Sequence, residues 1–160
     1  MRIYIESTIP SYLVARPARD LIQAARQQLT KDWWEHNRAT HELFTSQVVL
    51  DEISVGELAM AQFRLESLQT IPLLPVTDGV KELARKILES GLLPATADRD
   101  AVHIALASAY NLDILLSWNC RHIANAAIQS RLRRLVESAD FELPVICTPE
   151  ELMENNNEND

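Results

Sequence analysis

The sequence predicts an α/β protein in which helices cover a central parallel sheet of four to five short strands. Short apolar runs without polar alternation, such as Ile114–Leu116 (ILL), are typical of strands that are buried on both faces. Segments with helical periodicity separate these runs along the chain. Strands that alternate with helices favour parallel pairing through right-handed crossovers. The length of 160 residues fits one domain with a core of ordinary size.

Four segments are predicted strands. Arg2–Ile5 (RIYI) is a β-branched and aromatic run that predicts a buried first strand. The other candidates are residues 42–46 (ELFTS), Ile114–Leu116 and residues 144–147 (PVIC). Asn111 is predicted to close the helix before the ILL run, and Asp113 directly precedes that run.

Helices are predicted between these strands. In residues 20–37, the side chains of Leu21, Ala25, Leu29 and Trp33 recur every fourth position, which predicts one apolar face. The other predicted helices are residues 47–54, continuing or re-forming through 57–68, then 80–89, 101–109 and 130–137.

Two of these helices have informative sequences. Ser46 is placed to cap the helix over residues 47–54 through its hydroxyl oxygen. Residues 101–109 (AVHIALASA) are apolar nearly all round, so we expect this helix to be buried on most sides.

Most of the net charge of −8 lies at the C-terminal end. Residues 149–160 contain five acidic side chains and no Lys or Arg, and the run ENNNEND has nothing apolar to bury. We therefore divide the chain into a domain over residues 1–148 and an acidic extension over residues 149–160 whose end is frayed or disordered. The remaining body has a net charge of only −3, so the acidic balance argues only weakly against a nucleic-acid partner.

Composition excludes several classes of protein. Two cysteines cannot build a disulfide framework, and neither has a partner at zinc-site spacing. No apolar run approaches the roughly 20 residues that a membrane span needs. The first residues, MRIYIEST, contain an acid at position six and no secretory apolar region. We therefore expect a cytoplasmic globular protein without membrane contact.

Polar side chains are expected to converge at one edge of the sheet. Glu6 directly follows the first strand, and Asn119 closely follows the ILL strand within the sequence SWN. Asp100 opens the apolar helix, and Glu52 lies one to two turns into the helix after the ELFTS strand. Functional groups of open parallel sheets lie beyond the carboxyl ends of the strands. Convergent carboxylates repel one another unless a cation lies between them, which indicates Mg²⁺ or Mn²⁺.

Each acid also has a structural explanation when it is taken alone, as a strand end, a solvated helix face or a helix N-terminal acid. Two neighbours compete for the same roles. Asp98 is the alternative to Asp100, and we expect it to cap the helix instead. Asp51 lies about 100° round the helix from Glu52, so only one of the two can face the site.

Four segments resemble the PIN-domain family, especially the VapC-like toxins of bacterial toxin–antitoxin pairs. They are YIESTIPSYL (residues 4–13), SQVVLDEIS (46–54), DAVHIALASAYNLDILLSWNCRHIAN (100–125) and VICTPEEL (145–152). The resemblance implies a PIN-like α/β/α sandwich and an endoribonuclease that uses Mg²⁺ or Mn²⁺ to hydrolyse RNA. It also implies a homodimer and an antitoxin partner that blocks the acidic site.

The resemblance assigns the family's catalytic positions to Glu6, Glu52, Asp100 and Asn119, with Glu6, Glu52 and Asp100 as the metal ligands. Thr8 or Ser7 would orient a water or a ligand. The family usually has Asp at the first position, Thr-Ser after it and an acid at the fourth position. This chain has Glu6, Ser7-Thr8 and Asn119 there, so it keeps oxygen ligands but loses one negative charge.

Other side chains near these motifs have structural explanations that we favour. His103 lies three residues after Asp100 on one helical face and can reach the site, but a core histidine is the preferred interpretation. Cys120 and His122 suggest a nucleophile, but the sequence shows no orienting acid for them. Trp118 is expected to pack against the end of the strand rather than to stack on a base.

Two competing functions remain open on the sequence. A catalytically weak or inactive PIN-like binding module would account for Glu6, Asn119 and the absence of a strong basic surface. A phospho-acceptor receiver domain ranks below it, because that class needs an Asp at the end of a central strand.

Overall fold

The computed structural model describes the backbone of residues 1–157 and the side chains of residues 1–153. The elements follow one another in the order β1 (Arg2–Ile5), α1 (Thr8–Val14), α2 (Leu21–His36), the 3-10 helix η1 (Arg38–Thr40), β2 (Glu42–Phe44), α3 (Gln47–Ile53), α4 (Leu58–Leu68), α5 (Asp78–Glu89), α6 (Asp98–Ala109), β3 (Ile114–Leu116), α7 (Ala126–Ser138), β4 (Val145–Cys147) and α8 (Pro149–Asn157).

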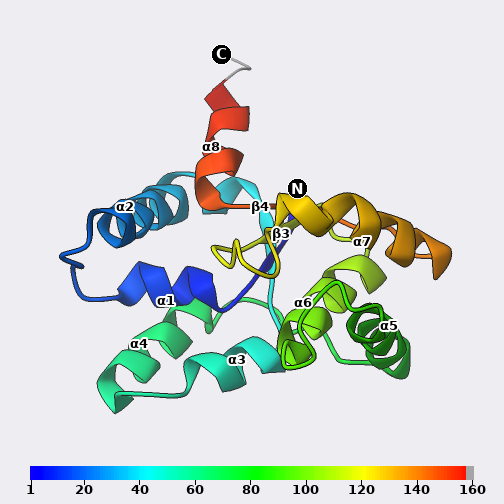
Figure 1. The fold of residues 1–160 in the computed structure, drawn as a ribbon. Coiled ribbons are helices and arrows are strands. Elements are labelled where there is room, and N and C mark those ends of the chain that lie inside the picture. The colour runs from blue at the N-terminus through cyan, green and yellow to red at the C-terminus, as the bar shows by residue number, and fades with distance from the viewer. Residues whose placement is uncertain (158–160) are drawn as a thin grey trace.

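The four strands form one sheet in the order β2-β1-β3-β4, and every neighbouring pair is parallel. In register, Ile3 of β1 lies opposite Ile114 of β3, and Ile114 lies opposite Val145 of β4. The sheet runs through the centre of the molecule, with α1, α2 and α4 on one side of it and α5, α6 and α7 on the other (Figure 1). The predicted central parallel sheet of short strands between helical layers is therefore confirmed.

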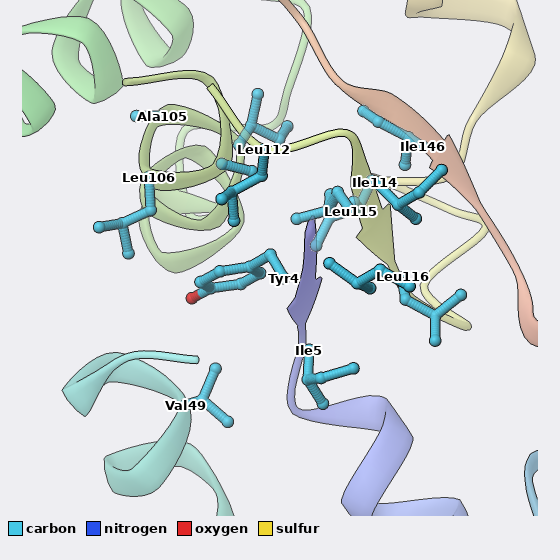
Figure 2. Close-up of a cluster of buried hydrophobic side chains, with 14 of the residues drawn as sticks. Tyr4, Ile5, Val49, Ala105, Leu106, Leu112, Ile114, Leu115, Leu116 and Ile146 are labelled. Carbon is cyan, nitrogen blue, oxygen red and sulfur yellow. The ribbon is translucent and has the colours of Figure 1, made fainter. Parts of the chain in front are cut away.

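The core lies on both faces of the two central strands, β1 and β3. Ile3 and Ile5 point to one face of β1 and Tyr4 to the other, and all three are fully buried. Figure 2 shows the Tyr4 ring beside the α6 side chains Ala105 and Leu106, with its hydroxyl directed toward α3. Each fully buried large apolar side chain contributes about 1.5–3 kcal/mol, so this packing fixes the position of the strand ends.

The predicted helix over residues 101–109 is confirmed as part of α6, and it is buried on most sides. Residues 103–108 are all buried, including His103 and Ser108 at 0% exposed. The expectation that Asp98 caps this helix is wrong. Asp98 is the first helical residue and lies exposed, while Ala97 occupies the N-cap position without a side-chain hydrogen bond.

Helix α2 forms where it was predicted, but the face that it buries differs from the expectation. The Asp20 side chain accepts the Gln23 N–H and so starts the helix. The buried positions are Gln27, Thr30 and Trp33, whereas Leu21 is 85% exposed. Trp33 and Leu29 of the predicted face do pack against the core, but the other buried positions, Gln27 and Thr30, are polar, and apolar spacing alone does not reveal them.

Helix α1 was not predicted from the sequence. It contains Pro10, which lies in the first turn, where the backbone N–H would have no intrahelical partner in any case. A proline here is compatible with the helix, and Ile9 and Pro10 are both buried. Helix α1 thus begins directly after β1 and holds the residues that follow Glu6 in a tight turn.

The C-terminal extension begins as a helix. Thr148 and Glu151 form a reciprocal cap at the start of α8, in which the Thr148 N–H donates to the Glu151 carboxylate at 2.8 Å and the Glu151 N–H donates to the Thr148 hydroxyl at 3.3 Å. Part of the run that the sequence predicts to be frayed is helical as far as residue 157. Residues 158–160 lie outside the described residues.

Two of the compositional expectations concern cysteines and membrane segments. Cys120 is exposed, Cys147 is buried, and both are free thiols. Over the described part of the chain, no helix combines the length and apolar character that crossing a membrane would require.

Candidate metal centre

The carboxyl ends of β1 and β3 bring Glu6 and Ser117 together. These strands are neighbours in the sheet, and the Glu6 N–H donates to the carbonyl of Leu116 at 3.3 Å. Glu6 is only 2% exposed and Ser117 is fully buried, so a carboxylate lies inside the protein at this edge of the sheet. A buried carboxylate needs hydrogen-bond donors or a cation.

Four hydrogen bonds hold the Glu6 carboxylate. Oε1 accepts the Ser7 hydroxyl at 2.7 Å. Oε2 accepts the Thr8 N–H at 3.0 Å, the Thr8 hydroxyl at 2.5 Å and the Ser117 hydroxyl at 2.8 Å. Thr8 also accepts the Trp118 N–H at 2.8 Å, which ties the start of α1 to the segment after β3. Both hydroxyls of the Ser7-Thr8 pair therefore act on the same carboxylate.

Glu52 reaches the site from α3 and contacts a buried histidine. The Nε2 atom of His103 lies 2.5 Å from Glu52 Oε1, and the Nδ1 atom lies 2.8 Å from the Tyr4 hydroxyl oxygen. The same hydroxyl lies 2.7 Å from Ser46 Oγ, and Ser46 caps α3 by accepting the Val49 N–H. A single chain of hydrogen bonds thus connects the start of α3, β1 and α6 to the Glu52 carboxylate.

Asp100 lies on the same face of α6 as His103 and is held by two other groups. Its Oδ1 accepts the Asn119 side-chain N–H at 3.3 Å, and its Oδ2 lies 2.8 Å from His122 Nδ1. Asn119 also donates its backbone N–H to the Ser117 hydroxyl at 2.9 Å and accepts the His122 N–H at 3.1 Å. Ser117 and Asn119 therefore link Asp100 to Glu6.

Glu6, Glu52 and His103 form a group that could hold a metal ion. Each offers one ligand atom, and these atoms all lie within 4.8 Å of one another. Asp100 is not part of this group. Among the described side chains, no hydrogen bond reaches Oε2 of Glu52, and Oε1 of Glu6 accepts only from Ser7. Carboxylate oxygens with unused lone pairs are the ligands that Mg²⁺ and Mn²⁺ prefer, so the donor set fits such an ion.

The pKa of two buried groups reflects this environment. Burial lowers the pKa of His103, but the hydrogen bond to Glu52 and the charges of Glu6, Glu52 and Asp100 outweigh that effect and raise it above its usual value. Burial raises the pKa of the Tyr4 hydroxyl well above its usual range. Tyr4 is therefore a neutral hydrogen-bonding group at any physiological pH.

Four of the five residues predicted from the sequence as catalytic lie in one connected set of hydrogen bonds, whereas Glu52 belongs to a separate chain that runs through His103. Glu6 and Glu52 come together in the possible metal group, Thr8 holds Glu6, and Asp100 and Asn119 lie beside them. The two competing acids lie elsewhere: Asp51 is exposed and accepts from Gln47 at 2.8 Å, and Asp98 is exposed at the start of α6.

Sequence reasoning missed three contributors to this arrangement. From the sequence, Tyr4 is predicted only as a residue of the first strand, and Ser117 only as part of the segment SWN that follows the ILL strand. His122 was set aside because no acid was expected near it, yet Asp100, which is 22 positions earlier, is that acid. Their positions in the sequence could have indicated Ser117 and Tyr4. Ser117 directly follows a central strand, and Tyr4 lies on the face of β1 opposite to that of Ile5.

His103 and Trp118 are both buried, as the structural interpretation expected. His103 is fully buried, and its Nε2 atom forms a hydrogen bond with Glu52 at the site. Trp118 is 6% exposed and donates its indole N–H to the Thr30 hydroxyl at 2.8 Å, so it packs against α2.

The fold is similar to that of a chain in the crystal structure of VapBC2 from Rickettsia felis bound to a DNA fragment from their promoter. The TM-score is 0.54 and the sequence identity is 14%, over 92% of this chain and 98% of that chain. The PIN-like α/β fold that the sequence resemblance implies is therefore confirmed. No family model matches the sequence, and no curated protein matches it.

Proposed function

We propose that this chain is a Mg²⁺- or Mn²⁺-dependent endoribonuclease that hydrolyses RNA phosphodiester bonds and acts as the toxin of a toxin–antitoxin pair. The observation that supports this proposal most is the approach of Glu6 and Glu52 at the carboxyl edge of a parallel sheet, with ligand atoms within 4.8 Å. Two carboxylates this close repel each other, and a cation bound between them would relieve that repulsion.

The metal would be held by Glu6 and Glu52, with Asp100 beside them directly or through water. A bound divalent cation supplies positive charge against the negative charge that develops on the phosphodiester, and it makes a nearby water more acidic. Ser7, Thr8 and Ser117 hold the Glu6 carboxylate in one orientation through their hydrogen bonds.

The residues around Asp100 would hold its carboxylate in place for the reaction. Asn119 and His122 fix the Asp100 carboxylate, and His122 is a quarter exposed at its side chain. In the hydrolysis, Asp100 would accept a proton from the attacking water or orient that water toward phosphorus. Preorganised side chains of this kind reduce the reorganisation that the reaction requires.

A partner and a homodimer are part of the same proposal. The similar solved structure is that of VapBC2 bound to promoter DNA, and we extend the proposal for this chain to an antitoxin partner and a homodimer. A basic side chain of the antitoxin, such as an arginine, would neutralise the Glu6–Glu52 pair by a charge-assisted hydrogen bond.

A second candidate function is a PIN-like binding module with little or no catalytic activity. The hydrogen bonds to the acids favour this function. The Glu6 carboxylate accepts four hydrogen bonds, and both oxygens of Asp100 already have partners. In this case the acids stabilise the fold, and the surface of the domain binds a protein or an RNA without cutting it.

Metal binding and RNA cleavage distinguish the two functions. The purified chain would be titrated with Mn²⁺ while thermal stability is followed, and cleavage of a mixed single-stranded RNA would be measured with and without the metal. We expect stabilisation by Mn²⁺ and a cleavage rate that falls about 100-fold or more in Glu52→Gln and Asp100→Asn.

The competing acids supply matched controls on the same two helices. Asp51→Asn and Asp98→Asn change exposed carboxylates next to Glu52 and Asp100, so they should cleave RNA at the wild-type rate. Absence of both metal stabilisation and metal-dependent cleavage in the wild-type protein would establish the binding module instead.

A further inference from the structure

The two buried groups behind Glu52 have no role in the function proposed above. His103 and Tyr4 are both fully buried in the core, where apolar side chains would pack as well. Tyr4 points into the same layer as the apolar residues of α6 (Figure 2). A phenylalanine would fill the space of the Tyr4 ring, so the hydroxyl is explained by its hydrogen bonds and not by packing.

We propose that Tyr4 and His103 are positioning residues that fix the orientation of the Glu52 carboxylate. The proposal deepens the function above and rests on it where metal binding is concerned. His103 belongs to the group that could hold a metal ion, but in this proposal it acts through Glu52, because both of its ring nitrogens already have hydrogen-bond partners, at 2.5 Å and 2.8 Å.

When the His103 ring is neutral, the donors and acceptors along this chain have one direction. Glu52 accepts, so His103 donates through Nε2. In this neutral ring, Nδ1 accepts the Tyr4 hydroxyl, and the Tyr4 oxygen then accepts the Ser46 hydroxyl. Ser46 Oγ in turn accepts the Val49 N–H at 3.4 Å. Each hydroxyl donates once toward Glu52, and the Tyr4 bond selects the histidine tautomer that can donate to the carboxylate.

Backbone geometry makes this chain rigid. Tyr4 lies in the central strand β1, paired on both sides with β2 and β3, and His103 lies in the middle of the buried helix α6. Glu52 is the only member that is partly exposed, with 20% of its side chain accessible. The fixed end of the chain is therefore in the core, and its free end is the carboxylate at the site.

Carboxylates that bind metals are commonly held by such partners, and the loss of a partner lowers metal affinity by about 10- to 100-fold. Without the Tyr4 hydroxyl, the His103 ring can change tautomer or rotate, and Glu52 then loses its donor for part of the time. The expected effect is weaker metal binding and a lower kcat with little change in KM, since substrate contacts are not altered.

The test compares Tyr4→Phe with Tyr110→Phe. Tyr110 follows α6 and donates its hydroxyl to the Pro75 carbonyl at 2.7 Å, away from the site, so the control removes one tyrosine hydroxyl bond of similar length. Two quantities are measured for each protein: the low-field NMR resonance of the His103 Nε2 proton without metal, and the dissociation constant of Mn²⁺.

We expect Tyr4→Phe to broaden or shift the Nε2 proton resonance and to weaken Mn²⁺ binding by 10-fold or more, while Tyr110→Phe changes neither. His103→Gln provides a second test, because its amide can still donate to Glu52 and accept from Tyr4. It should bind Mn²⁺ more tightly than His103→Leu, which can do neither.

The outcomes separate this inference from the proposed function. If wild-type protein binds no Mn²⁺, the metal-dependent function fails, and the metal-free proton resonance alone decides whether Tyr4 positions His103 and Glu52. An unchanged resonance in Tyr4→Phe, or Mn²⁺ affinities equal to wild type in Tyr4→Phe and His103→Leu, overturns the positioning role.

Discussion

The Ser117 hydroxyl donates to the Glu6 carboxylate across 2.8 Å, which joins the first residues after the two central strands. Both side chains are buried, so the hydrogen bond to a charged group contributes about 1.5–3 kcal/mol. Ser117→Ala should therefore lower the free energy of unfolding by that amount in urea denaturation at neutral pH.

Ser108→Ala is the matched control for this prediction. Ser108 is also fully buried, but its hydroxyl donates to the Ile104 carbonyl of its own helix at 2.8 Å. Alanine favours the helix and leaves no charge unpaired, so this variant should differ little from wild type. Equal losses of stability in the two variants would show that the Glu6 carboxylate does not depend on Ser117.

The strands and the acids could be predicted because their signals are local. Ile114–Leu116 is an uninterrupted apolar run, and Glu6 directly follows a strand, so both the sheet and the edge that holds the acid follow from short stretches of sequence. The choice of Glu52 over Asp51 rested on the family resemblance, because adjacent helix positions with apolar neighbours do not differ in pattern.

The partners of the acids could not be predicted because they are distant in the sequence. Tyr4 and His103 are 99 positions apart, and Asp100 and His122 are 22 apart, so no periodicity relates them. The buried face of helix α2 could not be predicted for a different reason. Its buried face includes Gln27, which bonds to the Ala18 N–H and the Arg16 carbonyl, and apolar spacing cannot detect a polar side chain that is buried with its partners.

Asn119→Asp would restore the acid that PIN-like sequences usually have at this position. The asparagine now donates to Asp100 at 3.3 Å, and an aspartate would replace this bond with repulsion between two carboxylates. Without metal, we expect a loss of about 1–3 kcal/mol in stability. With Mn²⁺, the added charge should increase both metal affinity and the thermal stabilisation that the metal produces.

Asn125→Asp is the control for the added charge. Asn125 caps α7 by accepting the Ala127 N–H at 3.0 Å, and aspartate is an equally good cap. Aspartate loses the bond that the Asn125 side-chain N–H donates to the exposed Arg121 carbonyl at 3.0 Å, so the variant's metal-free stability should fall by about 0.5–1.5 kcal/mol, while its response to Mn²⁺ should match that of wild type. If Asn119→Asp were as stable as wild type without metal, the predicted repulsion between the new carboxylate and Asp100 would be wrong.

His41 should make the protein less stable in mild acid. Its ring stacks on Trp33 at 6.2 Å between centroids, and neither ring nitrogen has a hydrogen-bond partner among the described residues. Burial, with a smaller effect of the N-terminal charge, lowers the pKa of His41 below its usual value of 6.5. The unfolded chain therefore binds the proton more readily than the folded protein does.

Stability from this group is then fully present above about pH 6.5 and decreases as the pH falls toward the lower pKa of the folded state. His41→Phe keeps a ring against Trp33 and removes the titrating group. Urea midpoints between pH 7.5 and 5.5 should fall less steeply in this variant than in wild type. Parallel curves for the two proteins would mean that His41 has the same proton affinity in both states.

The two cysteines should differ sharply in reactivity. Cys120 is exposed just after Asn119, whereas Cys147 at the end of β4 is buried and 5% exposed. Burial, with a contribution from the charge of Glu151, raises the pKa of Cys147 to about 12, so almost none of it is thiolate at neutral pH. A chromogenic disulfide reagent should titrate one thiol per chain rapidly in native protein and two in denaturant. Cys120→Ala should abolish the rapid phase and Cys147→Ala should leave it unchanged; a rapid phase that survives in Cys120→Ala would show that β4 opens readily at its end.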